Sequence, residues 1–246
     1  MPQIAVMNES TAISDADVQK MLPAFQQQWN NDLRAVWGVD DASFVFVPKN
    51  HMPSAGSWWL VFLDDSDQAD ALAYHDLTNQ GLPISKVFVK TLLADKASVS
   101  VGATHELCEM AVDPWLNSAY QDPKGVFWAG EVADPVESDQ YGYKIGDILV
   151  TDFITPNWFA HEHAHGHIDF KSHAHKAFDV LDGCAQHPSG ARATRIAPGT
   201  PYAPRSGAQT QRDKTRLAAG SRLAPCGCIE GGHKEQEIWF TQGRAV

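Results

Sequence analysis

Cysteine is scarce in this chain, and long apolar runs are missing. Only four of the 246 residues are cysteine, so no disulfide framework is indicated and a reducing compartment is favoured. No stretch of about 18 apolar residues is present, which argues against a membrane-spanning helix. The first residues lack a basic segment followed by a long apolar one, so we expect no secretory signal. These absences predict a cytoplasmic protein with no membrane partner.

Basic side chains are also few in the first 185 residues, where ten Lys and Arg stand against 26 Asp and Glu. An acidic body argues against a nucleic-acid-binding surface there. From residue 186 onward the balance reverses, with nine basic against four acidic residues. This basic tail could touch a polyanion, although a solvated tail without a core is favoured. Motifs of nucleotide-binding loops, serine nucleophiles and zinc fingers are absent as well.

The apolar pattern predicts several strands and an early helix. Ile4–Met7 reads as a buried strand, and an amphipathic helix follows over 14–38, which Pro23 should kink or start later. The continuous apolar run Trp58–Leu63 indicates a central strand covered on both faces, whereas the more polar Ala71–Asp76 indicates an edge. After Ile4–Met7, the strands predicted in this part are Ser43–Val47, Trp58–Leu63, Ala71–Leu77 and Lys86–Thr91.

The second half divides into the end of a folded body and a tail. Gly146-Asp147 favours a two-residue turn between Tyr141–Ile145 and Ile148–Phe153, which predicts a hairpin. The stretch His187–Gly232 is rich in Pro, Gly, Ala, Ser and Arg and lacks apolar periodicity. We therefore expect a folded domain over 1–183 and a flexible tail over 184–246, with Glu237–Thr241 docking back as a last strand.

The residues that carry chemistry gather on a helix predicted over Ser98–Val112, which Pro114 ends. His105 and Glu109 are four residues apart and share one helix face. An imidazole nitrogen and a carboxylate oxygen at that spacing can reach one ion at about 2 Å. Glu106 is turned about 100° from His105, so it can lie beside the ion as the general base for an activated water.

Other features of this helix support a bound ion. Asp113 lies one turn beyond Glu109 and could accept a hydrogen bond from a ligand. The alternative is a solvated polar face, but these charged residues sit in an otherwise small and apolar helix, where carboxylates need a counter-charge. We predict one zinc ion per chain. The hard carboxylate of Glu109 makes manganese or iron second choices.

These residues carry a resemblance to a known superfamily. The segment Thr104–Pro114 resembles the active helix of zincin-type metallopeptidases, with Glu109 in place of the second His of HExxH. More narrowly, the chain is similar to a bacterial and bacteriophage family with SHExxEMxxDP, EVxDPVE and PxWF segments. The last two appear here as Glu131–Glu137 and Thr155–Phe159. The resemblance covers about residues 15 to 183 and excludes the tail.

The resemblance implies a fold and a third metal ligand. It implies an α+β zincin-like domain, with a mixed twisted sheet, an N-terminal helix and a metal-binding active helix, followed by an irregular C-terminal part. Zincins of the thermolysin type take their third ligand from a downstream Glu that an Asp follows. Glu131 is therefore the expected ligand, with Asp134 supporting it by hydrogen bonding. Asp134 and Glu137 are the alternatives as third ligand.

Histidines outside the helix are further candidates. His75, on the predicted edge strand, could contact a substrate or polarise its carbonyl, although a structural histidine is somewhat favoured. A downstream cluster would place four imidazoles on one side if extended. It could bind a transition metal, sense pH or supply rival ligands, although an exposed polar loop is favoured. The cluster comprises His161, His163, His165 and His167, followed by His173 and His175.

Three functions remain open at this point. The first is a zinc peptidase in which Glu106 takes a proton from water and passes it to the leaving amine of a peptide or protein substrate. The second is a non-enzymatic, metal-stabilised structural or binding protein, assembled into a larger particle such as a virion. The third is another metal hydrolase, such as an amidase that acts on cell wall.

Overall fold

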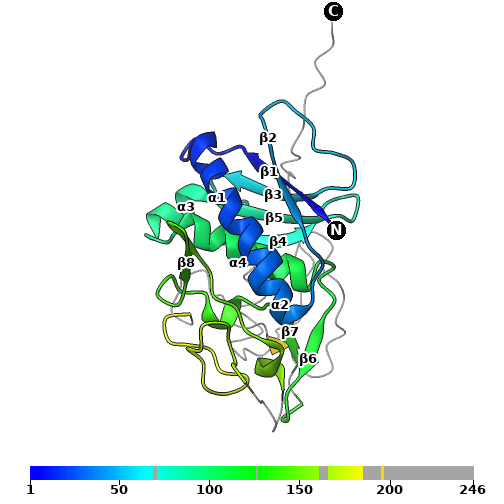
Figure 1. The fold of residues 1–246 in the computed structure, drawn as a ribbon, viewed down its shortest axis with the longest axis vertical. Coiled ribbons are helices and arrows are strands. Elements are labelled where there is room, and N and C mark those ends of the chain that lie inside the picture. The colour runs from blue at the N-terminus through cyan, green and yellow to red at the C-terminus, as the bar shows by residue number, and fades with distance from the viewer. Residues whose placement is uncertain (69–70, 126, 161–165, 185–194, 197–246) are drawn as a thin grey trace, which may run out of the picture.

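The computed structural model describes residues 1–68, 71–125, 127–160, 166–184 and 195–196. Within them the chain forms a mixed α+β fold around a five-stranded sheet (Figure 1). This confirms the α+β class, the mixed sheet and the N-terminal helix that the sequence predicts. No helix in this described part is both long and apolar enough to cross a membrane.

The five-stranded sheet has the order β2-β1-β3-β5-β4. Four strands run parallel, and β4 pairs antiparallel with β5 at one edge. The apolar run of β3 is central, and β4 is an edge strand, as predicted. The strands are β1 Gln3–Asn8, β2 Ser43–Val47, β3 Trp58–Leu63, β4 Ala73–Leu77 and β5 Pro83–Phe88.

The strand predicted over Lys86–Thr91 is wrong in its second half. The strand β5 ends at Phe88, and Val89–Ala94 form the helix α3. The buried residues Val89 and Leu92 are three residues apart, which fits a helix turn, but so short an apolar segment reads equally well as a strand. The chain then enters the helix α4, Val99–Val112, whose end before Pro114 agrees with the prediction.

The N-terminal helix begins before Pro23 and not after it. The helix α1, Asp15–Gln27, begins at Ser14, whose side chain accepts a hydrogen bond from the Asp17 amide. A π-helical segment over 28–33 continues it into α2, Arg34–Trp37, and Gly38 ends the helix at φ +70°. A later start is thus wrong, because Pro23 lies in the middle of α1.

The helices pack on the sheet face that holds the main core. Ile4, Leu60 and Phe62 point to this face and share one buried cluster with Phe25 of α1 and Met110 of α4. The opposite face has a small cluster of Met7, Val61 and Ile84. Strand alternation explains the division, since neighbouring residues of β1 and β3 point to opposite faces. The helix α4 is therefore enclosed, and twelve of its residues are buried.

The segments after α4 cover its far side. The hairpin β8–β9 forms around Gly146, at φ +59°, as predicted. A small sheet has the order β10-β7-β6, and two short 3-10 helices span Asp134–Val136 and Pro156–Phe159. The strand expected over Glu237–Thr241 lies outside the described residues. The strands here are β6 Ala119–Gln121, β7 Phe127–Ala129, β8 Tyr143–Ile145, β9 Ile148–Val150 and β10 Arg195–Ile196.

Candidate metal centre

Three parts of the chain bring histidine and carboxylate side chains together beneath the sheet edge. The helix α4 supplies His105, Glu106 and Glu109, and the edge strand β4 supplies His75. His75 is the buried residue of β4, while its neighbours on either side are only partly buried. Its register partner Ser85 directs its hydroxyl to the backbone carbonyl of Glu106, which ties α4 to the sheet at this level.

The segment that follows β7 closes the centre from the opposite side. Glu131 and Asp134 lie there, the latter at the start of a 3-10 helix with Pro135 as its second residue. Both carboxylates are buried, as are the two histidines and two glutamates from the other elements. The sequence therefore folds six ionisable groups into one enclosed volume.

One set of distances is centred on His105. Its Nε2 lies 3.2 Å from Oε1 of Glu109 and 3.3 Å from Oδ1 of Asp134. Two donor atoms bonded tetrahedrally to one zinc at about 2 Å are themselves about 3.3 Å apart. The spacing around His105 is thus the spacing that a common ion needs. His105, Glu109 and Asp134 form a group that could hold a metal ion.

A second set is centred on His75. Its Nδ1 lies 3.3 Å from Oε2 of Glu109, 3.4 Å from Oε2 of Glu106 and 3.8 Å from Oε2 of Glu131. His75, Glu109 and Glu131 form another group that could hold a metal ion. Glu109 belongs to both groups and presents a different oxygen to each.

Hydrogen bonding accounts for only part of the packing of these groups. Oε1 of Glu109 and Nε2 of His75 are buried and have no hydrogen-bond partner among the described residues. A polar atom in that condition costs free energy unless something else compensates it. Imidazole nitrogen and carboxylate oxygen are both ordinary zinc ligands. The residues present therefore fit a divalent cation.

Electrostatics in the cluster is dominated by opposed effects of burial and charge. Burial alone would lower the pKa of His75, but Glu131, Glu106 and Glu109 raise it to about 10. The pKa of His105 is also raised well above its usual value, by Glu109 and Asp134 against the effect of burial. For Glu109, burial would raise the pKa, but the two histidines hold it well below its usual range.

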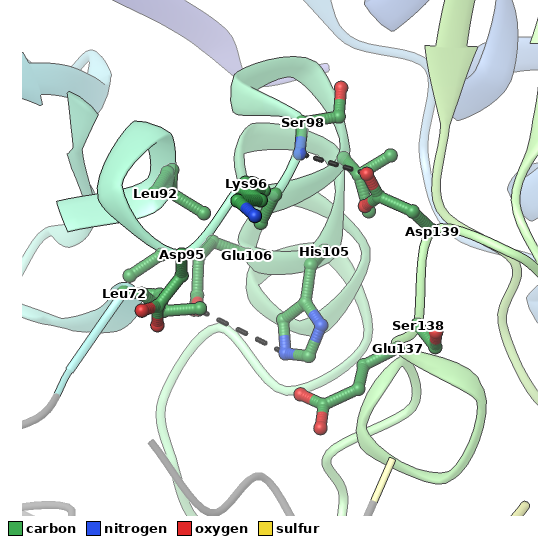
Figure 2. A pocket seen from close by; sticks show the side chains of 14 residues that line it. Leu72, Leu92, Asp95, Lys96, Ser98, His105, Glu106, Glu137, Ser138 and Asp139 are labelled. Carbon is green, nitrogen blue, oxygen red and sulfur yellow. Dashed lines mark hydrogen bonds and ion pairs between the residues drawn. The ribbon is translucent and has the colours of Figure 1, made fainter. Parts of the chain in front are cut away.

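The centre opens on a cavity of about 240 Å³ next to α4. Figure 2 shows His105 and Glu106 projecting from α4 into this space, with the Glu137 side chain below the His105 ring in this view. Burial raises the pKa of Glu137 well above its usual range, against the lowering effect of His105. Leu72, Leu92 and other apolar side chains also line the cavity.

The structure brings together most of the residues that the sequence singles out, but Glu131 and Asp134 neighbour other side chains than expected. Asp134, expected to support a ligand, is grouped with His105 and Glu109. Glu131, expected beside them, is grouped instead with His75 and Glu109. Asp113 faces away from both groups: its carboxylate accepts hydrogen bonds from the amides of Asn117 and Ser118, just after α4.

Sequence reasoning missed a third group, formed by Asp152, Asp169 and His173. Nδ1 of His173 lies 3.0 Å from Asp152 and 3.3 Å from Asp169. The histidine belongs to the His-rich segment, and Asp169 precedes it by four residues, but this segment shows no helical periodicity that would give the spacing meaning, and Asp152 is distant in sequence. The only sequence signal for Asp152 is that it stands within an apolar run directly after β9. His161, His163 and His165 lie outside the described residues.

Comparison of the chain with protein-family models, with curated proteins and with solved structures finds no match.

Proposed function

We propose that the protein is a metal-dependent hydrolase of the zincin type, a zinc peptidase in which Glu106 is the general base. The observation that carries the proposal is the group His105, Glu109 and Asp134, with Glu106 beside it at the wall of a cavity. The three ligands would hold one zinc ion. When bound, such an ion polarises a carbonyl group and makes water a stronger nucleophile.

The side chains around the ion have separable tasks. Oε1 of Glu106 lies 3.9 Å from Nε2 of His105, so the carboxylate is next to the metal position without belonging to its donor group. From there Glu106 can accept a proton from the attacking water and return it to the leaving amine. Nδ1 of His75 is 3.4 Å from Oε2 of Glu106, so this buried ring lies beside the base and is not placed to meet the substrate.

The edge strand supports a peptide as the substrate. In the described residues, β4 pairs with β5 along one side only. An extended peptide can add to such an edge through main-chain hydrogen bonds. Because His75 extends from β4 toward Glu106, a peptide on this edge would run past the reactive groups. In chain order the edge strand β4 is followed by β5 and, after the short α3, by α4, and an edge strand, a further strand and an active helix in this order resemble the zincin architecture.

Burial of the centre favours a second candidate, a metal-stabilised protein without catalysis that assembles into a larger particle. Glu106 is only 4% exposed and Glu109 only 1%. A structural metal site is closed, whereas a catalytic site keeps one position open. The cavity next to His105 and Glu106 supports the enzyme as the first candidate.

A cleavage assay on the full chain tests the proposal. Purified protein loaded with zinc should cut an unfolded polypeptide mixture, lose this activity with a chelator and regain it with zinc. Glu106→Gln should lower the rate by about 100-fold or more and leave the zinc content unchanged. Glu9→Gln, on an exposed glutamate, is the matched control and should leave the rate unchanged.

The other outcomes assign other functions. A protein that holds zinc and cuts neither polypeptides nor cell-wall fragments is the structural component of the second candidate. Cleavage of cell-wall fragments alone makes it an amidase. If Glu106→Gln retains full activity, Glu106 is not the base.

A further inference from the structure

Glu109 has two neighbours that a single-ion site does not require. Its Oε1 lies 3.2 Å from Nε2 of His105, and its Oε2 lies 3.3 Å from Nδ1 of His75. The two oxygens of one carboxylate therefore face two different imidazoles. A carboxylate held in this way has the arrangement of a bridge between two metal ions.

Each end of the bridge is completed by a further carboxylate. Asp134 lies 3.3 Å from Nε2 of His105, while Glu131 lies 3.8 Å from Nδ1 of His75. The result is two groups of one histidine and two carboxylates, which have only Glu109 in common. Glu106 spans both, since its Oε1 faces His105 and its Oε2 faces His75.

We propose that the centre binds two divalent cations that Glu109 bridges. His105 and Asp134 complete the first position, and His75 and Glu131 complete the second. The inference deepens the proposed function, because it concerns the same site. Metal pairs of this kind lie about 3.5–4 Å apart, a distance that the two oxygens of one carboxylate can span.

The charge of the cluster agrees with two cations. With neutral imidazoles, one divalent ion leaves half of the negative charge in the buried centre uncompensated, and a buried charge without a partner is strongly unfavourable. Two divalent ions balance the four carboxylates that face the two histidines. The carboxylates concerned are Glu106, Glu109, Glu131 and Asp134.

The rival arrangement has one cation at His105 and an imidazolium at His75 in place of the second. In both arrangements the buried Nε2–H of His75 has no hydrogen-bond partner among the described residues. The arrangements differ in the charge that they supply beside Glu106, Glu109 and Glu131. An imidazolium supplies one positive charge there, whereas a divalent ion held by the neutral ring supplies two, so the second cation is favoured.

Metal stoichiometry on the full chain tests the inference, with Mn²⁺ as the probe. Manganese prefers carboxylate and imidazole over thiolate, which keeps the cysteines from adding to the count. Equilibrium dialysis followed by elemental analysis should give two Mn²⁺ per chain. Electron paramagnetic resonance should show the exchange-coupled spectrum of a bridged pair in place of the six-line signal of isolated Mn²⁺.

Variants locate the second ion. His75→Gln and Glu131→Gln should each bind one Mn²⁺ with an isolated-ion spectrum, and circular dichroism should show that both remain folded. His173→Gln is the matched control, because His173 belongs to the separate group with Asp152 and Asp169. It should still bind a coupled pair.

Each contrary result overturns the inference. One Mn²⁺ in the unmodified protein means that His75 replaces the second cation. Two uncoupled ions mean that Glu109 is no bridge, and loss of the second ion in His173→Gln places it in the other group. These measurements need no substrate: a coupled pair without hydrolysis refutes only the proposed function, while hydrolysis with a single ion refutes only this inference.

Discussion

Glu109→Gln is the substitution that should disturb the metal-free centre most. The Glu109 side chain is 1% exposed, and it is the carboxylate shared by both donor groups. Glutamine keeps the volume and one oxygen but removes the charge. Without metal, that charge is what stabilises the protonated rings of His105 and His75, whose pKa values are raised by their carboxylate neighbours.

The size of the effect follows from the two contacts. Removing one partner of a buried ion pair costs about 3–5 kcal/mol. Because Glu109 is within 3.3 Å of both rings, we expect the upper part of that range, about 5 kcal/mol at pH 7. Glu106→Gln is the matched comparison. Its distances to the same rings are 3.4 and 3.9 Å, and losing one charged hydrogen bond costs about 1.5–3 kcal/mol.

Urea denaturation in the presence of a chelator measures both losses. The neighbouring histidines hold the pKa of Glu109 well below its usual 4.5. A carboxyl with a lowered folded pKa adds stability above its unfolded value, and this is lost as the pH falls through the folded one. The gap between wild type and Glu109→Gln should therefore be full between about pH 4.5 and 6.5 and shrink in stronger acid. It should also shrink as the pH rises toward 10, because the His75 ring then loses the proton that pairs with Glu109. Equal losses for both variants would refute the central place of Glu109.

Three further outcomes are expected. Burial and Asp169 raise the pKa of Asp152 to about 9. The folded chain therefore binds this proton more tightly than the unfolded chain, and its stability falls as the pH rises toward 9. Asp152→Asn should make the thermal-denaturation midpoint nearly independent of pH between pH 5 and 9. Gly102→Ala would bring a methyl group 2.9 Å from Cδ1 of Leu92 and should cost about 1–2 kcal/mol of unfolding free energy in urea, since overpacking exceeds the helix-propensity gain. Limited proteolysis should cut first within about 187–232, and elemental analysis should find the metal retained in the remaining fragment.

The helix that carries the centre could be predicted because its signals are local. Pro114 limits its end, and the spacing of His105 and Glu109 places both on one face whatever surrounds them. The edge position of β4 also follows from its more polar composition. Local signals failed at Val89–Ala94, because this apolar segment is too short for its periodicity to distinguish a strand from a helix. Contacts of α3 with the sheet and with α4 decide in favour of the helix.

The sequence identified the carboxylates that meet α4 in the centre, but it could not say which of them faces His105. Glu131 and Asp134 are three residues apart in a segment without periodicity, so nothing local says which one faces His105. The turn at Pro135 decides it, because the 3-10 helix begins at Asp134 and carries that side chain to His105. The place of His75 in the centre depends on the pairing of β4 with β5, which is a long-range property.

The composition of the centre is not the one that stability alone would favour. An apolar cluster of the same volume would stabilise the fold at least as well as a buried ion-pair network. The rest of α4 shows that the site can accommodate such a cluster, because Leu107, Cys108 and Met110 pack in the same core. Carboxylates that outnumber imidazoles in a buried site need positive charge from outside the chain. A bound cation would supply it, and the cavity that His105 and Glu106 line would give solvent a route to that side of the centre.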